Sequence, residues 1–189
     1  GAALAEAPLG AVPALRVAGP EGGPVLLWLH GGAYCIGSPR THAALAAALA
    51  RRVGAAAALP AYRLAPEHVF PAAVEDVRAA WDALVAEGIA PGRIALGGDS
   101  AGGGLAFALL AGLIAECAPL PAAVVAFSPW VDMTASGASL RTLARRDVLI
   151  PVARFAEIRD LYLAGADPRD VRASPALGRF PGAPPVLIQ

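Results

Sequence analysis

The sequence predicts an α/β fold: a mostly parallel β-sheet with helices on both faces. Short apolar runs of strand length alternate along the chain with longer runs whose apolar residues recur at helical spacing, which is typical of strand–helix–strand units. The short runs are apolar throughout, as expected for strands that helices cover on both faces. The 189 residues suffice for one hydrophobic core. We therefore expect residues 1–189 to form a single domain without a linker.

The apolar runs place the strands. We expect a short edge strand at 15–17 and buried strands at 24–30, 54–62, 93–96 and 121–128, and a further strand begins at 184. The run at 24–30 reads Pro-Val-Leu-Leu-Trp-Leu-His without a polar interruption before its final histidine. Such a run favours a strand at the centre of a parallel sheet.

The intervening segments predict helices at 41–52, 71–87, 105–116 and 151–163. Thr41 has a side chain suited to cap the first helix, because its hydroxyl can accept from a free backbone N–H. Gly88 follows the second helix at the position where a left-handed conformation ends helices. The helix at 151–163 is amphipathic, so it either packs on the core or also contacts a ligand.

The composition excludes several classes of function. The chain is 57% hydrophobic and 16% charged, with a formal net charge of +0. A nucleic-acid-binding protein needs a basic face, and a disordered chain has few apolar residues, so we expect neither. The sequence contains no Lys and is rich in Ala, Gly and Pro, which indicates a GC-rich bacterial gene.

Cysteine usage and hydropathy indicate the compartment. Cys35 and Cys117 lie far apart and form no metal or redox motif, so we expect both to be small buried residues in a reducing, cytoplasmic environment. The apolar helix segment 105–115 is too short to cross a bilayer, and the first residues lack the pattern of a signal peptide. We expect no stable membrane insertion, and neither a metal nor a cofactor.

The stretch Gly98-Asp99-Ser100-Ala101-Gly102 carries the clearest chemical signal. It lies between the strand predicted at 93–96 and the helix predicted at 105–116, and two more glycines follow it. G-x-S-x-G between a strand and a helix is the sequence form of a nucleophile elbow, which exposes the serine hydroxyl. The alternative is an ordinary serine in a glycine-rich turn, because the motif alone is weak in a chain with 21 Gly.

A second motif supports the first. His30-Gly31-Gly32 ends the apolar run at 24–30, upstream of the serine. Glycines leave backbone N–H groups free to bind the negative oxygen that forms when a serine attacks a carbonyl. The N–H of Ala101, directly after the serine, would be a further donor. The two motifs together are much more specific than either alone.

With these motifs in register, the chain resembles bacterial esterases of the hormone-sensitive lipase family, within the α/β-hydrolase superfamily. The resemblance covers most of the chain and rests on six stretches in the family's order. These are residues 30–38, 62–67, 70–73, 98–103, 128–132 and 167–170.

The resemblance implies an α/β-hydrolase fold, incomplete at its C-terminal edge, with a partial helical cap. It implies that Ser100 is the nucleophile and that 130–170 is a cap-region insertion. Tyr34 and Trp130 become candidates to line the substrate pocket. The implied oxyanion hole consists of Gly31, which shapes the loop, and the amide donors Gly32, Ala33 and Ala101. Where the family usually has a third glycine this chain has Ala33, which still supplies the backbone N–H.

The histidines depart from the family pattern. His30, His42 and His68 all precede Ser100, whereas the family's catalytic Asp and His follow it. We therefore expect the chain to be a fragment that lacks this Asp and His and part of the N-terminal cap, with little or no activity. His30 could be taken for the base, but we expect it to order the oxyanion loop. We expect His42 to face solvent and His68 to lie at the surface.

Four carboxylates need a role. Asp99 is next to the serine and points away from it on a sharp turn, so we expect it to make local hydrogen bonds. Asp132 and Asp147 are tempting substitutes for the catalytic acid, but we expect them to be helix caps or ion-pair partners. Glu67 is expected to pair with Arg63 and fix the turn between them.

The resemblance implies hydrolysis of short- to medium-chain acyl esters, a function in lipid metabolism, without a cofactor. The expected partner is a small acyl ester, and the full-length protein could form a homodimer. Two alternatives remain open. One is a non-catalytic small-molecule receptor on the same fold, and the other is hydrolysis of lactones or amides by the same residues.

Overall fold

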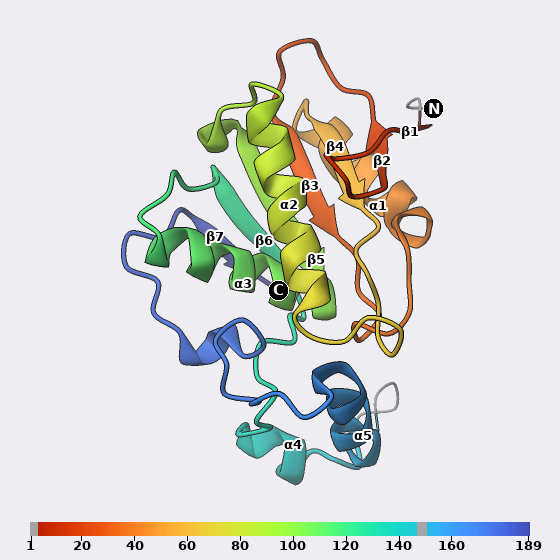
Figure 1. Ribbon diagram of the computed structural model, residues 1–189, viewed down its shortest axis with the longest axis vertical. Coiled ribbons are helices and arrows are strands. Elements are labelled where there is room, and N and C mark those ends of the chain that lie inside the picture. The colour runs from red at the N-terminus through yellow and green to blue at the C-terminus, as the bar shows by residue number, and fades with distance from the viewer. Residues whose placement is uncertain (1–3, 147–150) are drawn as a thin grey trace.

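The computed structural model describes residues 4–146 and 151–189, and its centre is a seven-stranded sheet (Figure 1). The middle and one side of the sheet are parallel, whereas the first two strands in the sheet order pair antiparallel. In spatial order the strands are β1 (Leu4–Glu6), β2 (Ala14–Val17), β4 (Ala56–Pro60), β3 (Val25–Leu29), β5 (Ile94–Asp99), β6 (Ala123–Phe127) and β7 (Val186–Ile188).

The predicted strands are all present, but the strand predicted at the edge, β2, pairs on both sides, because an unpredicted strand lies outside it. All five residues of β3 are buried, in agreement with its uninterrupted apolar run at the centre of the sheet. The strand missed is β1, whose three residues are all exposed. An edge strand of three exposed residues has no apolar run to reveal it, because neither of its faces is covered.

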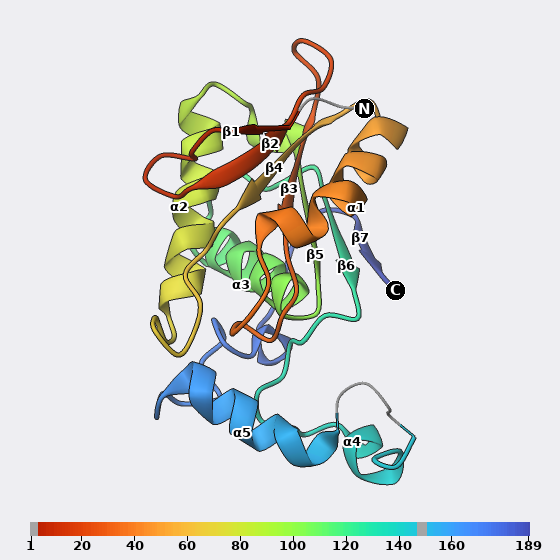
Figure 2. The same cartoon turned by 90° about the vertical axis from the view of Figure 1, so that its right-hand side faces the viewer.

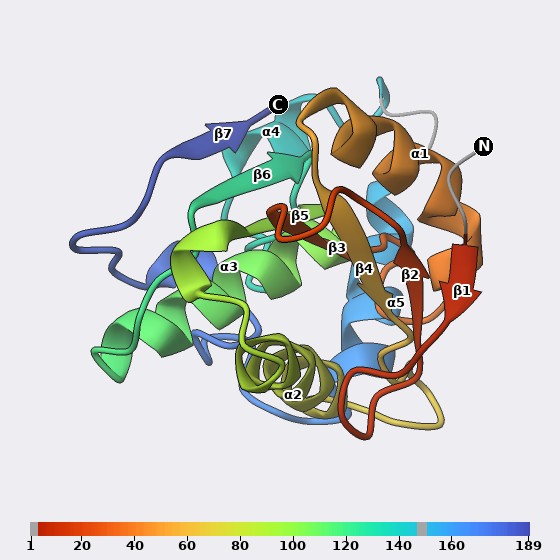
Figure 3. The ribbon, with the colours of Figure 1, turned by 90° about the horizontal axis from the view of Figure 1, so that it is seen from above.

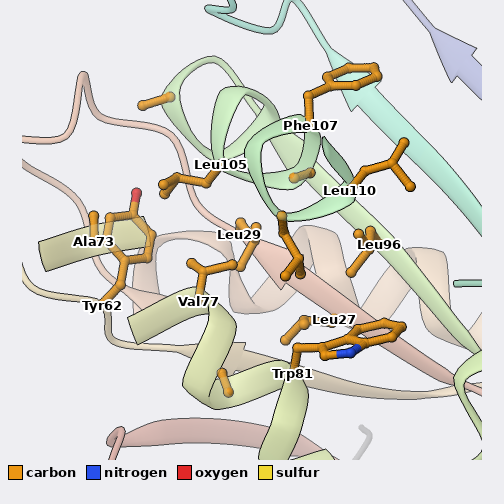
Figure 4. Close-up of a cluster of buried hydrophobic side chains, with 14 of the residues drawn as sticks. Leu27, Leu29, Tyr62, Ala73, Val77, Trp81, Leu96, Leu105, Phe107 and Leu110 are labelled. Atoms are coloured by element: carbon orange, nitrogen blue, oxygen red, sulfur yellow. The ribbon is translucent and has the colours of Figure 1, made fainter. Parts of the chain in front are cut away.

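Helices cover both faces of the sheet (Figures 2 and 3). On one face lies α1 (Pro39–Arg52), which buries a stripe of alanines against β2, β3 and β4. On the other lie α2 (Ala72–Ala86) and α3 (Ala101–Ala115). Figure 4 shows this larger cluster, in which Leu27 and Leu96 of the strands meet Trp81 of α2 and Leu110 of α3. The layered α/β architecture is therefore as predicted.

The start of α1 corrects one prediction. Thr41 is not the N-cap: the helix begins two residues earlier, at Pro39, and Ser38 caps it. The Ser38 side chain accepts from the Thr41 N–H at 3.4 Å, and the Thr41 hydroxyl accepts from the Ser38 N–H at 3.2 Å. This reciprocal pair is a capping box in which a threonine takes the usual place of Glu or Gln. Pro39 was missed as a helix residue, although proline is common at the first helical position.

We expect replacement of Ser38 by alanine to lower the free energy of unfolding by about 1 kcal/mol. The change removes the side chain that accepts from the Thr41 N–H. Chemical denaturation of the variant and of the parent measures the difference. A Ser38→Asp variant, which keeps an acceptor at the cap, should retain the parent's stability. Equal losses in both variants would contradict the capping role.

A second difference concerns α3. The sequence predicts its start at residue 105, but the helix begins at Ala101, directly after Ser100. Gly102, Gly103 and Gly104 are therefore helical and buried. Glycine is a poor helix former. Here neighbouring backbone packs closely against these glycines, and this packing outweighs the low helix propensity.

Residues beyond the carboxyl ends of the parallel strands form a separate small layer (Figures 1 and 2). It holds α4 (Ala138–Thr142) and α5 (Val152–Leu163), both within the predicted cap region. Tyr162 of α5 stacks on Tyr34 with ring centroids 4.0 Å apart, and its carbonyl accepts from the Phe70 N–H at 2.9 Å. Asp147 lies outside the described residues. Two single-turn 3-10 helices, Pro91–Arg93 and Pro175–Leu177, complete the described elements.

Among the helices of residues 4–146 and 151–189, none combines the length and the apolarity that a membrane-spanning helix needs.

Candidate active site

Ser100 occupies a strained turn between β5 and α3. Its backbone adopts φ +51° and ψ −118°, a conformation that residues with a side chain rarely take. The Ser100 N–H donates to the Phe127 carbonyl at 2.9 Å. The Ser100 carbonyl accepts from the N–H groups of Gly104 at 3.0 Å and Trp130 at 2.9 Å. Three backbone hydrogen bonds thus hold a costly conformation that projects the side chain from the end of the strand.

The glycines on each side of Ser100 allow this turn to form. A Cβ on Gly98 would lie 2.5 Å from the Gly102 carbonyl carbon. A Cβ on Gly102 would lie 2.6 Å from the His30 carbonyl oxygen and would overlap the Leu29 carbonyl oxygen. Real Cβ atoms do not approach this closely, so the elbow requires glycine at both positions. The contact of Gly102 also brings the elbow against the end of β3, where the second motif begins.

The loop after β3 presents unpaired backbone donors. Gly32, Ala33 and Tyr34 all have positive φ, at 128°, 55° and 62°, and the Gly32 carbonyl accepts from the N–H groups of Cys35 and Ile36. Within 4–146 and 151–189, the N–H groups of Gly32 and Ala33 have no hydrogen-bond acceptor. Consecutive residues in such conformations form a nest that binds anions. The loop therefore presents free amides at two of the positions predicted to be oxyanion donors, and the left-handed Ala33 costs only about 1–2 kcal/mol relative to a glycine.

One pocket joins the elbow to this loop. A cavity of about 470 Å³ is lined by Ser100 and by Gly32 and Ala33 of the loop. The N–H of Ala101, in the first turn of α3, also has no acceptor in the part of the chain that the structure describes. A serine at an elbow and free amides on one cavity form the geometry of acyl transfer.

The α/β-hydrolase fold model matches residues 26–189 of this sequence. This chain belongs to that family. A crystal structure of an esterase from the bacterial hormone-sensitive lipase family superposes on this chain with a TM-score of 0.93 and 46% identity. That match covers 100% of this chain and 64% of the other, and it confirms the resemblance inferred from the motifs.

Curated relatives of this chain include two named for ester cleavage. An acetyl-hydrolase of Streptomyces hygroscopicus is 49% identical over 169 residues, which are 89% of this chain and 56% of the relative. An esterase of Acinetobacter venetianus is 36% identical over 166 residues, covering 87% and 55%. This chain thus spans a little over half the length of these relatives.

His30 supports the loop after β3, as predicted. Its ring is buried, and Nδ1 donates to the Gly31 carbonyl at 2.8 Å. Tyr62 stacks on the ring with centroids 4.2 Å apart, and its hydroxyl donates to the His30 carbonyl at 2.6 Å. Burial is the main cause that lowers the pKa of His30. A neutral ring with one N–H therefore fixes the start of the loop.

His42 corrects a prediction, because it does not face solvent. Its side chain is 20% exposed, and Nε2 lies 3.2 Å from both carboxylate oxygens of Asp99. Asp99 was expected to make local hydrogen bonds, but its partner is 57 residues away in the sequence. His68 is exposed, as predicted.

Two predicted carboxylate roles are also wrong. Arg63 does not pair with Glu67; its Nε donates to Asp76 at 2.9 Å and its Nη2 to Glu75 at 3.2 Å. These acceptors lie on α2, and the acidic face of that helix was visible in the sequence. Asp132 is neither a helix cap nor an ion-pair partner in the described chain.

Asp132 organises the loop that follows Trp130. Its carboxylate accepts from the N–H and hydroxyl groups of Thr134 and Ser136, at 2.5–2.9 Å. Burial raises the pKa of Asp132, but these hydrogen bonds together outweigh burial and leave the pKa below its usual value. The carboxylate therefore stays ionised and closes a turn by the local bonding typical of aspartate.

The walls of this cavity are mostly apolar, and the predicted cap region supplies five of its eleven lining residues. Trp130 lines the cavity beside Ser100, and the centroid of its ring lies 4.9 Å from that of Phe155. Tyr34 does not line it: the side chain is 2% exposed and lies between Tyr162 and Trp130. The cap residues on the wall are Leu140, Val152, Phe155 and Ile158. Phe155 and Ile158 were not singled out from the sequence, although both lie on the helix predicted to be amphipathic.

The described residues do not supply a base to Ser100. No side chain in 4–146 or 151–189 forms a hydrogen bond with the Ser100 hydroxyl, and His30 and His42 are bound elsewhere. The same ranges contain no group of three or more His, Cys, Asp or Glu side chains able to hold a metal. The cysteines differ from expectation: Cys35 is partly buried and Cys117 is exposed.

Proposed function

We propose that this hydrolase cleaves carboxylic esters through an acyl-enzyme on Ser100. The observation that carries the proposal is the shared cavity of Ser100 and the unpaired amides of Gly32 and Ala33. The printed names of the relatives, acetyl-hydrolase and esterase, support this reaction class. Hydrolysis by this route needs no metal or cofactor.

The chemistry follows from the positions of these groups. Ser100 Oγ attacks the ester carbonyl carbon, and its proton passes to a general base. The carbonyl oxygen becomes negative and accepts from the N–H groups of Gly32, Ala33 and Ala101. Collapse of this intermediate breaks the bond to the alcohol, which leaves with the proton held by the base. Water then attacks the acyl-serine in the same way and releases the acid.

In the family, a histidine and an aspartate that follow the nucleophile act as the general base and its acidic partner. The relatives extend well beyond the matched stretch, since this chain spans only 56% and 55% of the two named above. We expect the catalytic histidine and aspartate in the part of the full-length protein that corresponds to that remaining length. Without them, the serine and oxyanion loop would leave roughly 10³–10⁴-fold acceleration over water.

The apolar cavity is suited to bind the acyl chain of the substrate. Trp130, Phe155 and Ile158 form an apolar wall beside Ser100, and the cavity of about 470 Å³ limits the length of a bound chain. We expect short- to medium-chain acyl groups to be preferred. An apolar wall gains about 0.8 kcal/mol for each buried methylene until the cavity is full.

The test combines labelling and turnover. A fluorophosphonate should modify Ser100 in the natural full-length protein, with the adduct located by peptide mass spectrometry. The same protein should hydrolyse p-nitrophenyl esters, with kcat/KM rising and then falling as the acyl chain grows. Matched lactones and amides in the panel separate the alternative hydrolase activities. Failure both to label Ser100 and to turn over any ester would refute the proposal and favour a receptor on the same fold.

A further inference from the structure

A carboxylate lies beside the loop that must stabilise a negative charge. Asp99 ends β5 and directly precedes Ser100. A Cβ on Gly31 would lie 3.0 Å from Asp99 Cγ and would overlap Oδ2. The carboxylate therefore rests against the backbone of the residue before Gly32, the first oxyanion donor. The Asp99 side chain is 26% exposed, so water screens its charge only in part.

An unpaired charge at this place would oppose the reaction. The transition state develops a negative oxygen at the amides of Gly32 and Ala33, and a nearby anion raises its energy. The effect is large in a partly buried site, because the effective dielectric constant there is well below that of water. A proposed oxyanion hole next to Asp99 thus requires a positive partner for this carboxylate.

His42 is placed to be that partner. Its Nε2 is 3.2 Å from each carboxylate oxygen of Asp99. Its Nδ1 is 2.8 Å from Thr41 Oγ1. The Thr41 hydroxyl donates its own proton to the Ser38 carbonyl at 2.7 Å. With that proton on the Ser38 carbonyl, the arrangement lets both ring nitrogens of His42 donate, Nδ1 to Thr41 Oγ1 and Nε2 to Asp99.

Within residues 4–146 and 151–189, His42 is the one basic side chain that pairs with the Asp99 carboxylate. The nearest other ring, His30, is 5.8 Å from His42 by ring centroids and donates its Nδ1 proton to the Gly31 carbonyl. His30 therefore orders the loop, and the task of compensating the charge is left to His42.

We propose that His42 is a positioning residue whose positive charge neutralises Asp99 and so preserves the electropositive oxyanion loop. This inference rests on the proposed esterase function. It assigns a catalytic consequence to a side chain that touches neither the substrate nor the nucleophile. It also explains why a carboxylate is tolerated directly before Ser100.

The decisive variant is His42→Gln. Glutamine keeps an N–H donor for Asp99 but removes the charge, so a purely structural role predicts no change. We expect a roughly tenfold lower kcat at unchanged KM in the full-length protein. Adding Asp99→Asn removes the uncompensated anion, and the double variant should recover to within about threefold of the parent kcat. This rescue distinguishes charge compensation from packing.

The control removes a positive charge elsewhere. Arg16 pairs with Glu87 at 2.8 Å outside the pocket, and Arg16→Gln should leave kcat unchanged. Circular dichroism and thermal unfolding verify that each variant folds. A His42→Gln enzyme as fast as the parent, or a double variant as slow as His42→Gln, would overturn the inference and leave the esterase proposal intact. Absence of turnover in the parent would overturn both.

Discussion

Replacement of Ser100 by alanine is expected to lower kcat for ester hydrolysis by about a millionfold in the full-length protein. The change removes the nucleophile, and the amides of Gly32 and Ala33 then act only on direct attack by water. Turnover assays with a short p-nitrophenyl ester measure kcat of the variant and of the parent. Fluorophosphonate labelling of the variant should fall to background.

The fold should survive this change, since the Ser100 hydroxyl makes no hydrogen bond within the described residues. Ser100→Gly is the matched variant: it lacks the same hydroxyl but accepts φ +51° without strain. We expect it to be as inactive as Ser100→Ala and more stable than that variant by about 1 kcal/mol. Substantial turnover in either variant would show that another nucleophile acts in this protein.

Gly102→Ala should be the most damaging single methyl group in the elbow. The added Cβ would overlap the Leu29 carbonyl oxygen and lie 2.6 Å from that of His30. Both atoms belong to backbone, so α3 and the end of β3 must move apart. We expect a loss of about 3 kcal/mol in the free energy of unfolding, measured by denaturant titration. Because His30 leads into the oxyanion loop, kcat should also fall by about a hundredfold.

Gly112→Ala is the control on the same helix. A Cβ at this position of α3 meets no atom within 4 Å. Alanine is the better helix former, so the variant should gain about 0.5–1 kcal/mol and keep full activity. Gly102→Ala should lower the free energy of unfolding and Gly112→Ala should raise it. This contrast separates the packing requirement at Gly102 from helix propensity. Similar stabilities for both variants would refute the packing argument.

The sequence determined the parts of this protein that depend on short-range rules. An uninterrupted apolar run predicted β3, and G-x-S-x-G between a strand and a helix predicted the elbow at Ser100. These patterns are readable because backbone sterics and burial act within a few residues of each other. The loop after β3 belongs to the same class, since its Gly-Gly pair indicated an unusual local backbone, and Gly32 has φ 128°.

The tertiary structure decided which distant side chains meet. It paired His42 with Asp99, moved Arg63 from Glu67 to α2, and turned Tyr34 away from the pocket onto Tyr162. Each outcome depends on the angle at which one element packs on another and on the φ of single loop residues, such as 62° at Tyr34. Residue spacing does not encode these angles, because they arise from the packing of the whole core.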